Sequence, residues 1–381
     1  MIVATGVGWT SHPARALGGE LAAAWDALNH RCGDLPFLSA DCVAAALEQF
    51  GTGRERLYLR RDATDVSAAV VLQSKGPMRQ DVFQPSQLPL GASLFAPGLG
   101  VDIAAQELLR ALPWWVVSLG LTQLDPRLQP RPQDSATSIG SDYIETGWVD
   151  LAGDFESYWR ARGKNLRENM RKQRRKLAEA GTRCTLRIHE SVDAVKPALH
   201  RYSALETSGW KAREGTAIAP DNAQGRFYAS ILDTACARHE GRIYEYAFDD
   251  RTVAMELCLL RGDAIVILKT AYDEAVDRAY SPAFLMRQEQ IEQLFAEGRV
   301  KRIEFYGRFM EWHGRWTGSR CTLYHLTSFR WPIIARLRAR RTSSERGQQP
   351  VETAGPSREL TGTADAPTHA PGRTTDRVST S

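Results

Sequence analysis

The stretch that decides the fold is residues 241–298, GRIYEYAFDDRTVAMELCLLRGDAIVILKTAYDEAVDRAYSPAFLMRQEQIEQLFAEG. Runs of β-branched, aromatic and other apolar residues alternate here with the turn pairs Asp249-Asp250 and Gly262-Asp263. This pattern predicts three successive strands, at Arg242–Phe248, Thr252–Leu260 and Ala264–Tyr272. A helix is predicted over Ser281–Glu297, because a proline stands in its first turn and a glycine follows its end.

The same kind of pattern extends outward over the rest of the C-terminal half. A long helix is predicted over Phe155–Ala180, between an Asp154 cap and Gly181. After that entry helix the predicted order is β, α, α, β, β, β, α, β, α, β. The remaining elements of this half are predicted at Thr182–His189, Val192–Ser208, Asn222–His239, Lys301–Tyr306 and Thr322–Arg330, with a short helical stretch before the last strand.

The N-terminal half shows a fainter copy of this order. Its predicted strands are Ile2–Val7, Leu57–Leu59, Ser67–Gln73, Met78–Phe83, Trp114–Leu119 and Tyr143–Val149, and its predicted helices are Glu20–His30, Asp41–Phe50 and Asp102–Ala111. The repetition predicts an α/β (α+β) protein with two related domains, residues 1–150 and 151–341, each a mixed sheet flanked by helices. Residues 342–381 hold few large apolar residues, so we expect a disordered tail there.

Composition limits the class of protein. Of the 381 residues, 43% are apolar and 25% charged, which excludes collagen-like, coiled-coil and wholly disordered chains. The net charge of +4 is too small to predict a nucleic-acid partner. Neither a signal peptide nor an apolar run long enough to cross a membrane is evident. Scattered cysteines without C-x-x-C spacing, and histidines without H-x-x-x-H spacing, indicate a reduced cytoplasmic protein with no metal site.

One helix stands out by its charge. Between Arg160 and Lys176 lie nine basic residues and one acid, Glu168. Such a run could contact the phosphates of a coenzyme or nucleic acid, or a polyanionic glycan. A solvated linking helix has the same composition and is the favoured interpretation. Nucleic acid is disfavoured because few aromatic residues interleave with the charges.

Four stretches in order carry a family resemblance over about residues 155–330. They are Tyr158-Trp159, Lys164-Asn165-Leu166-Arg167, Arg174-Arg175-Lys176-Leu177 and Gly181; Leu205-Glu206, Trp210-Lys211 and Gly215; Leu268-Lys269, Tyr272-Asp273 and Tyr280-Ser281-Pro282; and Glu304-Phe305, Gly307 and Trp312. With these residues the second half resembles the acetyltransferase domain of the BioF2-like and CelD-like group within the GNAT acyltransferase superfamily, which is related in architecture to the Fem aminoacyltransferases. The resemblance implies a tandem GNAT fold and acyl transfer from a coenzyme A thioester to an amine or hydroxyl.

The coenzyme residues follow from this resemblance. GNAT enzymes share a Gln/Arg-x-x-Gly-x-Gly/Ala segment at a helix start, where backbone N–H groups favour a pyrophosphate. This chain has Arg278, Ser281 and Ala283 at those places, with Tyr280 and Phe284 alongside. The proline after Ser281 removes one N–H donor. An ordinary Ser-Pro helix start is the alternative interpretation.

Four residues are candidates for the chemistry. Lys269 ends an apolar strand, so its charge is expected near a phosphate, thioester or acidic group, or else in solvent at the strand end. Tyr272 could protonate a leaving thiolate, and Asp273 could act as base, although a Tyr-Asp turn is the alternative. Glu256 could be the base if it faces the cleft, or a solvated residue if it faces outward.

The acceptor side is expected near Glu206, Trp210 and Lys211, and near Gly307 and Trp312, with the N-terminal half forming one wall. The sequence thus predicts an acetyl-CoA-dependent N-acyltransferase for a small-molecule or glycan amine, in polysaccharide or cell-envelope metabolism. Two alternatives stay open: a Fem-like transferase that uses aminoacyl-tRNA, and a non-catalytic GNAT scaffold in exopolysaccharide assembly. The acceptor, the acyl chain, the base, the oligomeric state and whether the enzyme is active cannot be deduced from the sequence.

Overall fold

The computed structural model describes residues 8–62, 65–208, 218–277 and 279–336. The described part of the first half contains β1 (Gly8–Pro13), η1 (Ala14–Ala16), α1 (Gly19–Arg31), η2 (Pro36–Leu38), α2 (Ala40–Phe50), β2 (Arg56–Asp62), β3 (Asp65–Ser74), β4 (Arg79–Val82), β5 (Ser93–Phe95), α3 (Val101–Ala111), β6 (Ser118–Leu124) and β7 (Ser138–Asp150). The second contains α4 (Phe155–Arg160), α5 (Lys164–Glu179), β8 (Cys184–His189), α6 (Val192–Ser208), α7 (Ala223–Ala237), β9 (Gly241–Phe248), β10 (Arg251–Arg261), β11 (Ala264–Tyr272), α8 (Pro282–Glu297), β12 (Arg302–Glu304), α9 (Glu311–Gly314) and β13 (Arg320–Phe329).

The two halves repeat one order of elements, which confirms the predicted tandem α/β fold. From β1 the order is β, α, α, β, β, β, then α3 and β6, with β5 as an extra short strand beside β3. From β8 the same order leads to α8 and β12. Each half also holds one parallel pair, β4 with β6 and β11 with β12, among antiparallel neighbours.

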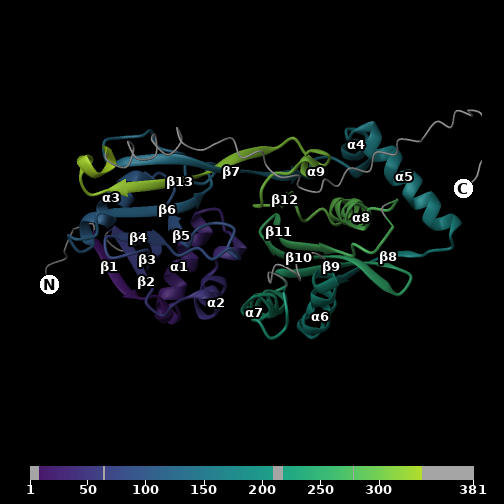
Figure 1. The fold of residues 1–381 in the computed structure, drawn as a ribbon, viewed down its shortest axis with the longest axis horizontal. Coiled ribbons are helices and arrows are strands. Elements are labelled where there is room, and N and C mark those ends of the chain that lie inside the picture. Colours follow the sequence, from purple (N-terminus) through teal and green to yellow (C-terminus); the bar gives the residue numbers. More distant parts are fainter. Residues whose placement is uncertain (1–7, 63–64, 209–217, 278, 337–381) are drawn as a thin grey trace, which may run out of the picture.

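The strands form one continuous sheet (Figure 1) in the order β1-β2-β3-β4-β6-β13-β7-β12-β11-β10-β9-β8, with β5 paired to β3. The last strand of the described residues, β13, lies between β6 and β7 of the first half. In turn, β7 extends past β13 and pairs through Trp148–Asp150 with β12. The halves therefore share their closing strands. The predicted boundary at residue 150 stays a prediction.

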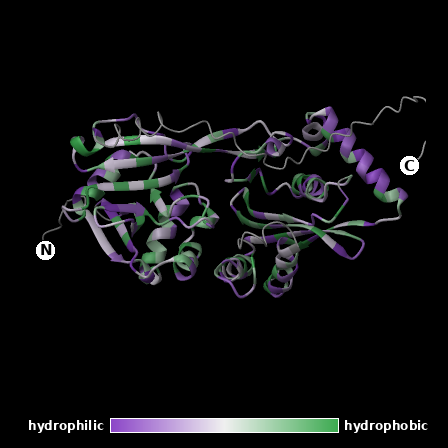
Figure 2. Cartoon of the chain, viewed as in Figure 1, coloured by the Kyte–Doolittle hydropathy of each residue, from purple (hydrophilic) through white to green (hydrophobic). Residues whose placement is uncertain are grey.

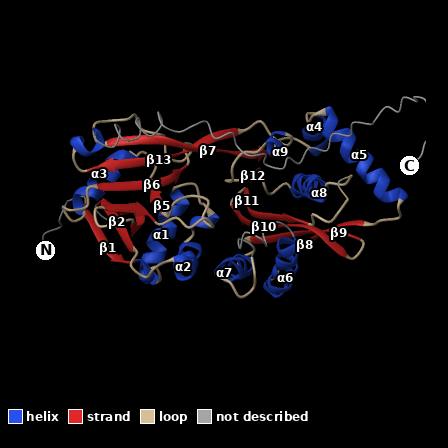
Figure 3. Cartoon of the chain, in the orientation of Figure 1, coloured by secondary structure: helices blue, strands red, loops and turns tan. Residues whose placement is uncertain are grey.

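Helices cover both faces of the sheet (Figure 3). One apolar core contains buried residues of α1, α2, α6 and α7, so it runs through both halves on one face. On the other face, α8 and the α4–α5 segment cover β9–β11, and α3 covers β3, β6 and β13. In the described residues, no helix combines the length and apolar composition needed to cross a membrane.

Two sequence predictions differ from the structure, and two lie outside the described residues. The predicted helix 155–180 is two helices, because Gly163 adopts an extended conformation and starts α5 afresh. The predicted strand Trp114–Leu119 is wrong: Trp114 and Trp115 lie in a loop, exposed by 73% and 51%, and the strand begins at Ser118. The predicted strand Ile2–Val7 lies outside the described residues, and the first described strand is β1. The predicted tail at 342–381 also lies outside them.

Candidate functional site

The two parallel strands of the second half separate inside the sheet. β11 pairs with β12 only from Ala264 to Val266, although β11 continues to Tyr272. The chain after β12 stays with β7 instead, where Phe305 N–H donates to the Gly147 carbonyl at 3.2 Å. Beyond Val266, β11 has no β12 partner in the described residues. An edge of β11 is thus available to pair with an extended ligand.

A β-bulge marks the start of this edge. Leu257 of β10 faces Lys269, but the next residue, Cys258, faces Ile267, so Leu268 is the extra residue. A bulge bends a strand and re-aims the side chains that follow it. Lys269 accordingly points to the α6–α7 face of the sheet, where its Nζ lies 3.3 Å from Gln224 Oε1. Thr270 points to the α8 face, where its hydroxyl donates to Glu256 at 3.1 Å.

The start of α8 packs against the same apolar core as Tyr272, the last residue of β11. Ser281 is its N-cap residue and Pro282 its first residue. A side chain from the basic helix covers this start: Ser281 N–H donates to Gln173 Oε1 at 3.1 Å, and Gln173 Nε2 donates to Ser281 Oγ at 3.4 Å. Nearby, Tyr280 packs edge-on against Phe248, while Ala283 and Phe284 join the core beneath α8. Arg278 lies outside the described residues.

Glu256 is fully buried under α8, so the solvated alternative is wrong. Burial raises the pKa of Glu256, and Arg287, with which it forms an ion pair, opposes that rise. Glu256 Oε2, Arg287 Nη1 and both polar atoms of the Gln290 amide are buried without a hydrogen-bond partner. Polar atoms left this way are costly, and they indicate a place where water or a polar group can bind.

The α6–α7 face carries a second polar cluster. The buried Glu206 carboxylate accepts from Ile218 N–H at 2.8 Å and from the Tyr202 hydroxyl at 3.2 Å. Lys269 Nζ lies 3.6 Å from Glu206 Oε1 and 5.7 Å from the centre of the Tyr228 ring. The structure therefore brings together Glu206 and Lys269, which are 63 positions apart in the printed sequence. Trp210 and Lys211 lie outside the described residues.

The two residues at the end of β11 point to different partners. Tyr272 is half-buried against the core under α8, and burial raises the pKa of its hydroxyl. Asp273 is tied to Arg251, whose Nε donates at 2.9 Å, and it also accepts from Ala275 N–H at 2.9 Å. Asp273 therefore already serves as an ion-pair partner and turn-forming residue.

Gly307 and Trp312 follow β12. A Cβ on Gly307 would meet only the Phe305 carbonyl oxygen, at 3.8 Å, so no protein atom demands glycine there. The Trp312 ring stacks on His313, with ring centres 3.5 Å apart. Burial, aided by Arg287, lowers the pKa of His313 to about 3, so this imidazole is neutral.

Sequence reasoning missed several polar residues around β11. Thr270, Gln173 and His313 gave no pattern that separates them from ordinary surface residues. Arg287 and Gln290 did give a signal, because they stand three positions apart on the apolar face of a predicted helix. Polar residues on such a face are buried with partners or serve a site.

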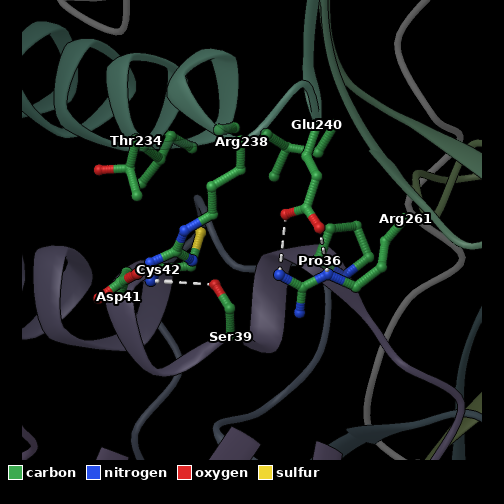
Figure 4. A pocket seen from close by; sticks show the side chains of 11 residues that line it. Pro36, Ser39, Asp41, Cys42, Thr234, Arg238, Glu240 and Arg261 are labelled. Atoms are coloured by element: carbon green, nitrogen blue, oxygen red, sulfur yellow. Dashed lines mark hydrogen bonds and ion pairs between the residues drawn. The ribbon is translucent and has the colours of Figure 1, made fainter. Parts of the chain in front are cut away.

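The hollow in Figure 4 lies where α2 meets α7, and its lining contains none of the predicted site residues. Arg261 and Glu240 form an ion pair across it at 2.9 Å, and Ser39 caps α2 by accepting from Cys42 N–H at 3.3 Å. It is a contact region between the halves. Among the described residues, no group of three or more His, Cys, Asp or Glu side chains could hold a metal ion.

Comparison with known protein families gives a match over residues 164–316. This part of the chain matches the family model described as an acetyltransferase (GNAT) domain. The matched range includes β11, β12 and α8, so the strand separation and the start of α8 lie within the GNAT match. None of the curated protein sequences matches the chain.

Two solved structures share the overall fold. One is the C-terminal domain of a putative lysylphosphatidylglycerol synthetase from Agrobacterium fabrum, with 12% identity and a TM-score of 0.50, covering 83% of this chain and 96% of that one. The other is a conserved protein of unknown function from Bacteroides thetaiotaomicron, with 8% identity and a TM-score of 0.54, covering 81% and 97%. At such identities the likeness concerns the fold alone.

Proposed function

We propose that the protein transfers an acyl group, acetyl in the first instance, from an acyl-CoA to an amine. The separation of β11 from β12, the two strands that α8 connects, carries this proposal. A coenzyme A arm is an extended chain with amide groups, and the β11 edge offers backbone partners for such a chain. The matched GNAT family supports the same donor.

The residues around the start of α8 fit the phosphates of the coenzyme. Ser281 offers an N–H and a hydroxyl, and their present partner is the neutral side-chain amide of Gln173, which a phosphate could replace. The positive end of a 16-residue helix adds a favourable field. Ala283 leaves room for close approach, with Arg278, Tyr280 and Phe284 as the proposed flanking contacts. The missing N–H of Pro282 reduces the number of donors.

The acceptor binds on the α6–α7 face in this proposal. Lys269 and Glu206 would orient the amine, with Trp210, Lys211, Gly307 and Trp312 as further contacts. Tyr272 would donate the proton to the leaving thiolate, since its raised pKa keeps the hydroxyl protonated at neutral pH. Glu256 and Asp273 remain the proposed bases. Glu256 lies on the opposite, α8 face, so it would have to take the proton through water, and each base would have to act while paired to an arginine. The resemblance to the CelD-like group supports an amino-sugar acceptor.

Calorimetric titration of the full chain with acetyl-CoA tests the proposal. Wild type should bind saturably, and Ser281→Trp should lose binding because the indole fills the helix start. Ser191→Trp is the matched control, since Ser191 is an exposed serine immediately before α6. If Ser281→Trp binds acetyl-CoA as well as wild type does, the coenzyme binds somewhere other than the start of α8. No binding of any acyl-CoA by wild type would contradict the donor class.

A second candidate is transfer from an aminoacyl-tRNA, and the surface of α5 favours it. Arg171, Lys172, Arg175 and Lys176 are exposed along this helix, which Figure 2 shows as strongly hydrophilic. The same helix reaches the start of α8 through Gln173. RNA affinity that falls steeply with salt, and is lost in Arg171→Glu/Lys172→Glu, would support this candidate if acetyl-CoA does not bind. If the chain binds neither acetyl-CoA nor RNA, a non-catalytic scaffold is the remaining interpretation.

A further inference from the structure

Large apolar side chains are exposed together at one end of the first half. The described residues contain nine exposed large hydrophobic side chains, and five of them belong to three neighbouring segments. Single exposed apolar residues are ordinary, but a group of them indicates a binding surface. We call this group the tryptophan patch. It consists of Met78, Trp114, Trp115, Trp331 and Ile333.

Backbone contacts hold the three segments of the patch together. Val117 N–H donates to the Met78 carbonyl at 2.8 Å, which joins the β3–β4 turn to the loop after α3. Arg330 N–H donates to the Val117 carbonyl at 2.9 Å, which joins the end of β13 to the same loop. The Arg330 guanidinium also donates to the Leu112 carbonyl at 3.0 Å at the end of α3. The patch is therefore built on a hydrogen-bonded frame.

The side chains of the patch point outward while their neighbours face the core. Trp114 and Trp115 meet edge to face, with ring centres 6.1 Å apart, and they are exposed by 73% and 51%. In the turn after β13, Ala335 is buried, whereas Ile333 is exposed by 65%. The segment therefore turns its small residue inward and its large apolar residue to solvent.

The surroundings of the patch are basic. No Asp or Glu occurs in residues 74–80, 108–118 or 326–344. Lys75, Arg110 and Arg336 are exposed in the described part of these segments. Indole rings favour the boundary between hydrocarbon and water, and basic residues favour anionic headgroups. A symmetric contact with a second copy would place these like charges opposite one another.

We propose that the tryptophan patch binds the surface of an anionic phospholipid bilayer. The rings of Trp114, Trp115 and Trp331 enter the headgroup region, and the basic residues contact lipid phosphates. The acyltransferase fold lies in the other half, with α5 at the far end of the molecule from α3 (Figure 1). The patch therefore attaches the protein to a membrane surface without covering the candidate site. This inference does not depend on the donor or acceptor proposed above.

Vesicle sedimentation of the full chain tests this inference. We expect binding to vesicles of phosphatidylglycerol mixed equally with phosphatidylcholine, a blue shift of tryptophan emission, and no binding to phosphatidylcholine alone. Trp114→Ser/Trp115→Ser should weaken binding at least about tenfold, and Arg110→Glu/Arg336→Glu should weaken it while leaving the rings in place. Tyr143→Ser/Met310→Ser removes two exposed apolar side chains elsewhere and should bind like wild type.

Three results would overturn the inference. The first is wild type that does not sediment with anionic vesicles, and the second is a tryptophan variant that binds as well as wild type. The third is light scattering that shows a dimer in wild type and a monomer in Trp114→Ser/Trp115→Ser, which would make the patch a self-association surface. A chain ending at residue 341 should bind like the full chain. If the shortened chain binds the vesicles and the full chain does not, residues 342–381 would cover the patch.

Discussion

Arg127 of the first half joins the two halves of the molecule by binding Glu304 of the second half. It lies between β6 and β7, and its Nη1 and Nη2 atoms donate to the two carboxylate oxygens of Glu304 on β12 at 2.9 and 3.0 Å. Asp125 accepts from the same guanidinium at 2.6 Å, and the Trp148 ring lies 4.3 Å from it. Both carboxylates are buried. A two-pronged contact of this kind fixes where β12 lies as it leaves β11.

Arg127→Met should destabilise the protein by about 3–5 kcal/mol, because it removes the arginine partner of buried Asp125 and leaves buried Glu304 with the half-exposed Arg302, at 3.6 Å. Urea unfolding measures this. Arg320→Met is the control, since its ion pair with Glu145 at 3.5 Å is half exposed and should cost less than about 1 kcal/mol. Adding Glu304→Gln to Arg127→Met should recover part of the loss. Equal costs for the two single variants would contradict a buried role.

Stability should depend on pH through Glu245. Burial alone would raise the pKa of this carboxyl, but hydrogen bonds from His189, Arg201 and Thr252 outweigh it and hold the pKa at about 2, below the ordinary 4.5. The charged form is thus favoured in the folded state by about 3 kcal/mol at 1.36 kcal/mol per pKa unit. This stabilisation is complete above pH 4.5 and is lost as the pH falls towards 2.

Unfolding free energies of wild type and Glu245→Gln between pH 6 and pH 3 measure this dependence. The advantage of wild type over the variant should shrink as the pH falls. Glu179→Gln, at an exposed i,i+4 pair with Arg175, is the control. A constant difference across the range would show that Glu245 is not held ionised by its partners.

Two glycine substitutions should have opposite effects. A Cβ on Gly225, in the first turn of α7, would lie 1.9 Å from the Ala219 carbonyl oxygen, so Gly225→Ala should destabilise by about 1–3 kcal/mol. This clash outweighs the roughly 1 kcal/mol by which alanine favours a helix. Gly163→Ala meets no atom within 4 Å and should be neutral or slightly stabilising. Thermal unfolding of both variants measures these effects. A Tm of Gly225→Ala above that of wild type would contradict the close packing against Ala219.

Lys269→Met should impair the acceptor half of the proposed reaction. Loss of the cation beside Glu206 should lower kcat/KM for the amine roughly ten- to a hundredfold through misplacement of the acceptor. The Kd of acetyl-CoA should stay nearly unchanged, and Lys269→Arg should retain part of the activity. Lys301→Met, at an exposed lysine, is the control. An equal loss of acetyl-CoA affinity would place Lys269 at the coenzyme instead.

Local patterns in the sequence predicted most of the elements, whereas the pairing of distant strands could not be predicted. The run 242–272 and the Pro282 and Gly298 signals correspond to β9–β11 and α8, because these signals act within a few residues. Nothing local shows that β13 enters the first half, since its partners on β6 lie some 200 positions earlier. Trp114 was misassigned because an apolar run predicts burial, whereas tertiary structure leaves this one exposed.

The candidate site shows the same limit. The sequence around the end of β11 indicated Lys269, Tyr272 and Asp273 as candidates. The direction in which each side chain points depends on the bulge at Leu268 and on arginine partners from other strands. Burial of Glu256 depends on Arg287 from another element. Such features arise from packing between segments, so a single sequence offers only polar residues on apolar faces as a signal.

Residues 1–150 alone should fail to fold. Without β13, the facing edges of β6 and β7 lose their shared partner. The fragment should give poorly dispersed NMR amide signals, and co-expression with residues 151–341 should restore a folded complex. A dispersed spectrum from the isolated fragment would contradict this dependence.

The position of β13 also delays the folding of the first half while the protein is being synthesised. The ribosome makes β6 and β7 early but supplies the strand between them only after residue 320. At about 5–20 residues per second, the nascent first half waits on the order of ten to thirty seconds with an open gap in its sheet. Chaperones that shield unpaired strand edges should therefore act on this chain during translation, and its two halves should reach their final form as one event once β13 has been made.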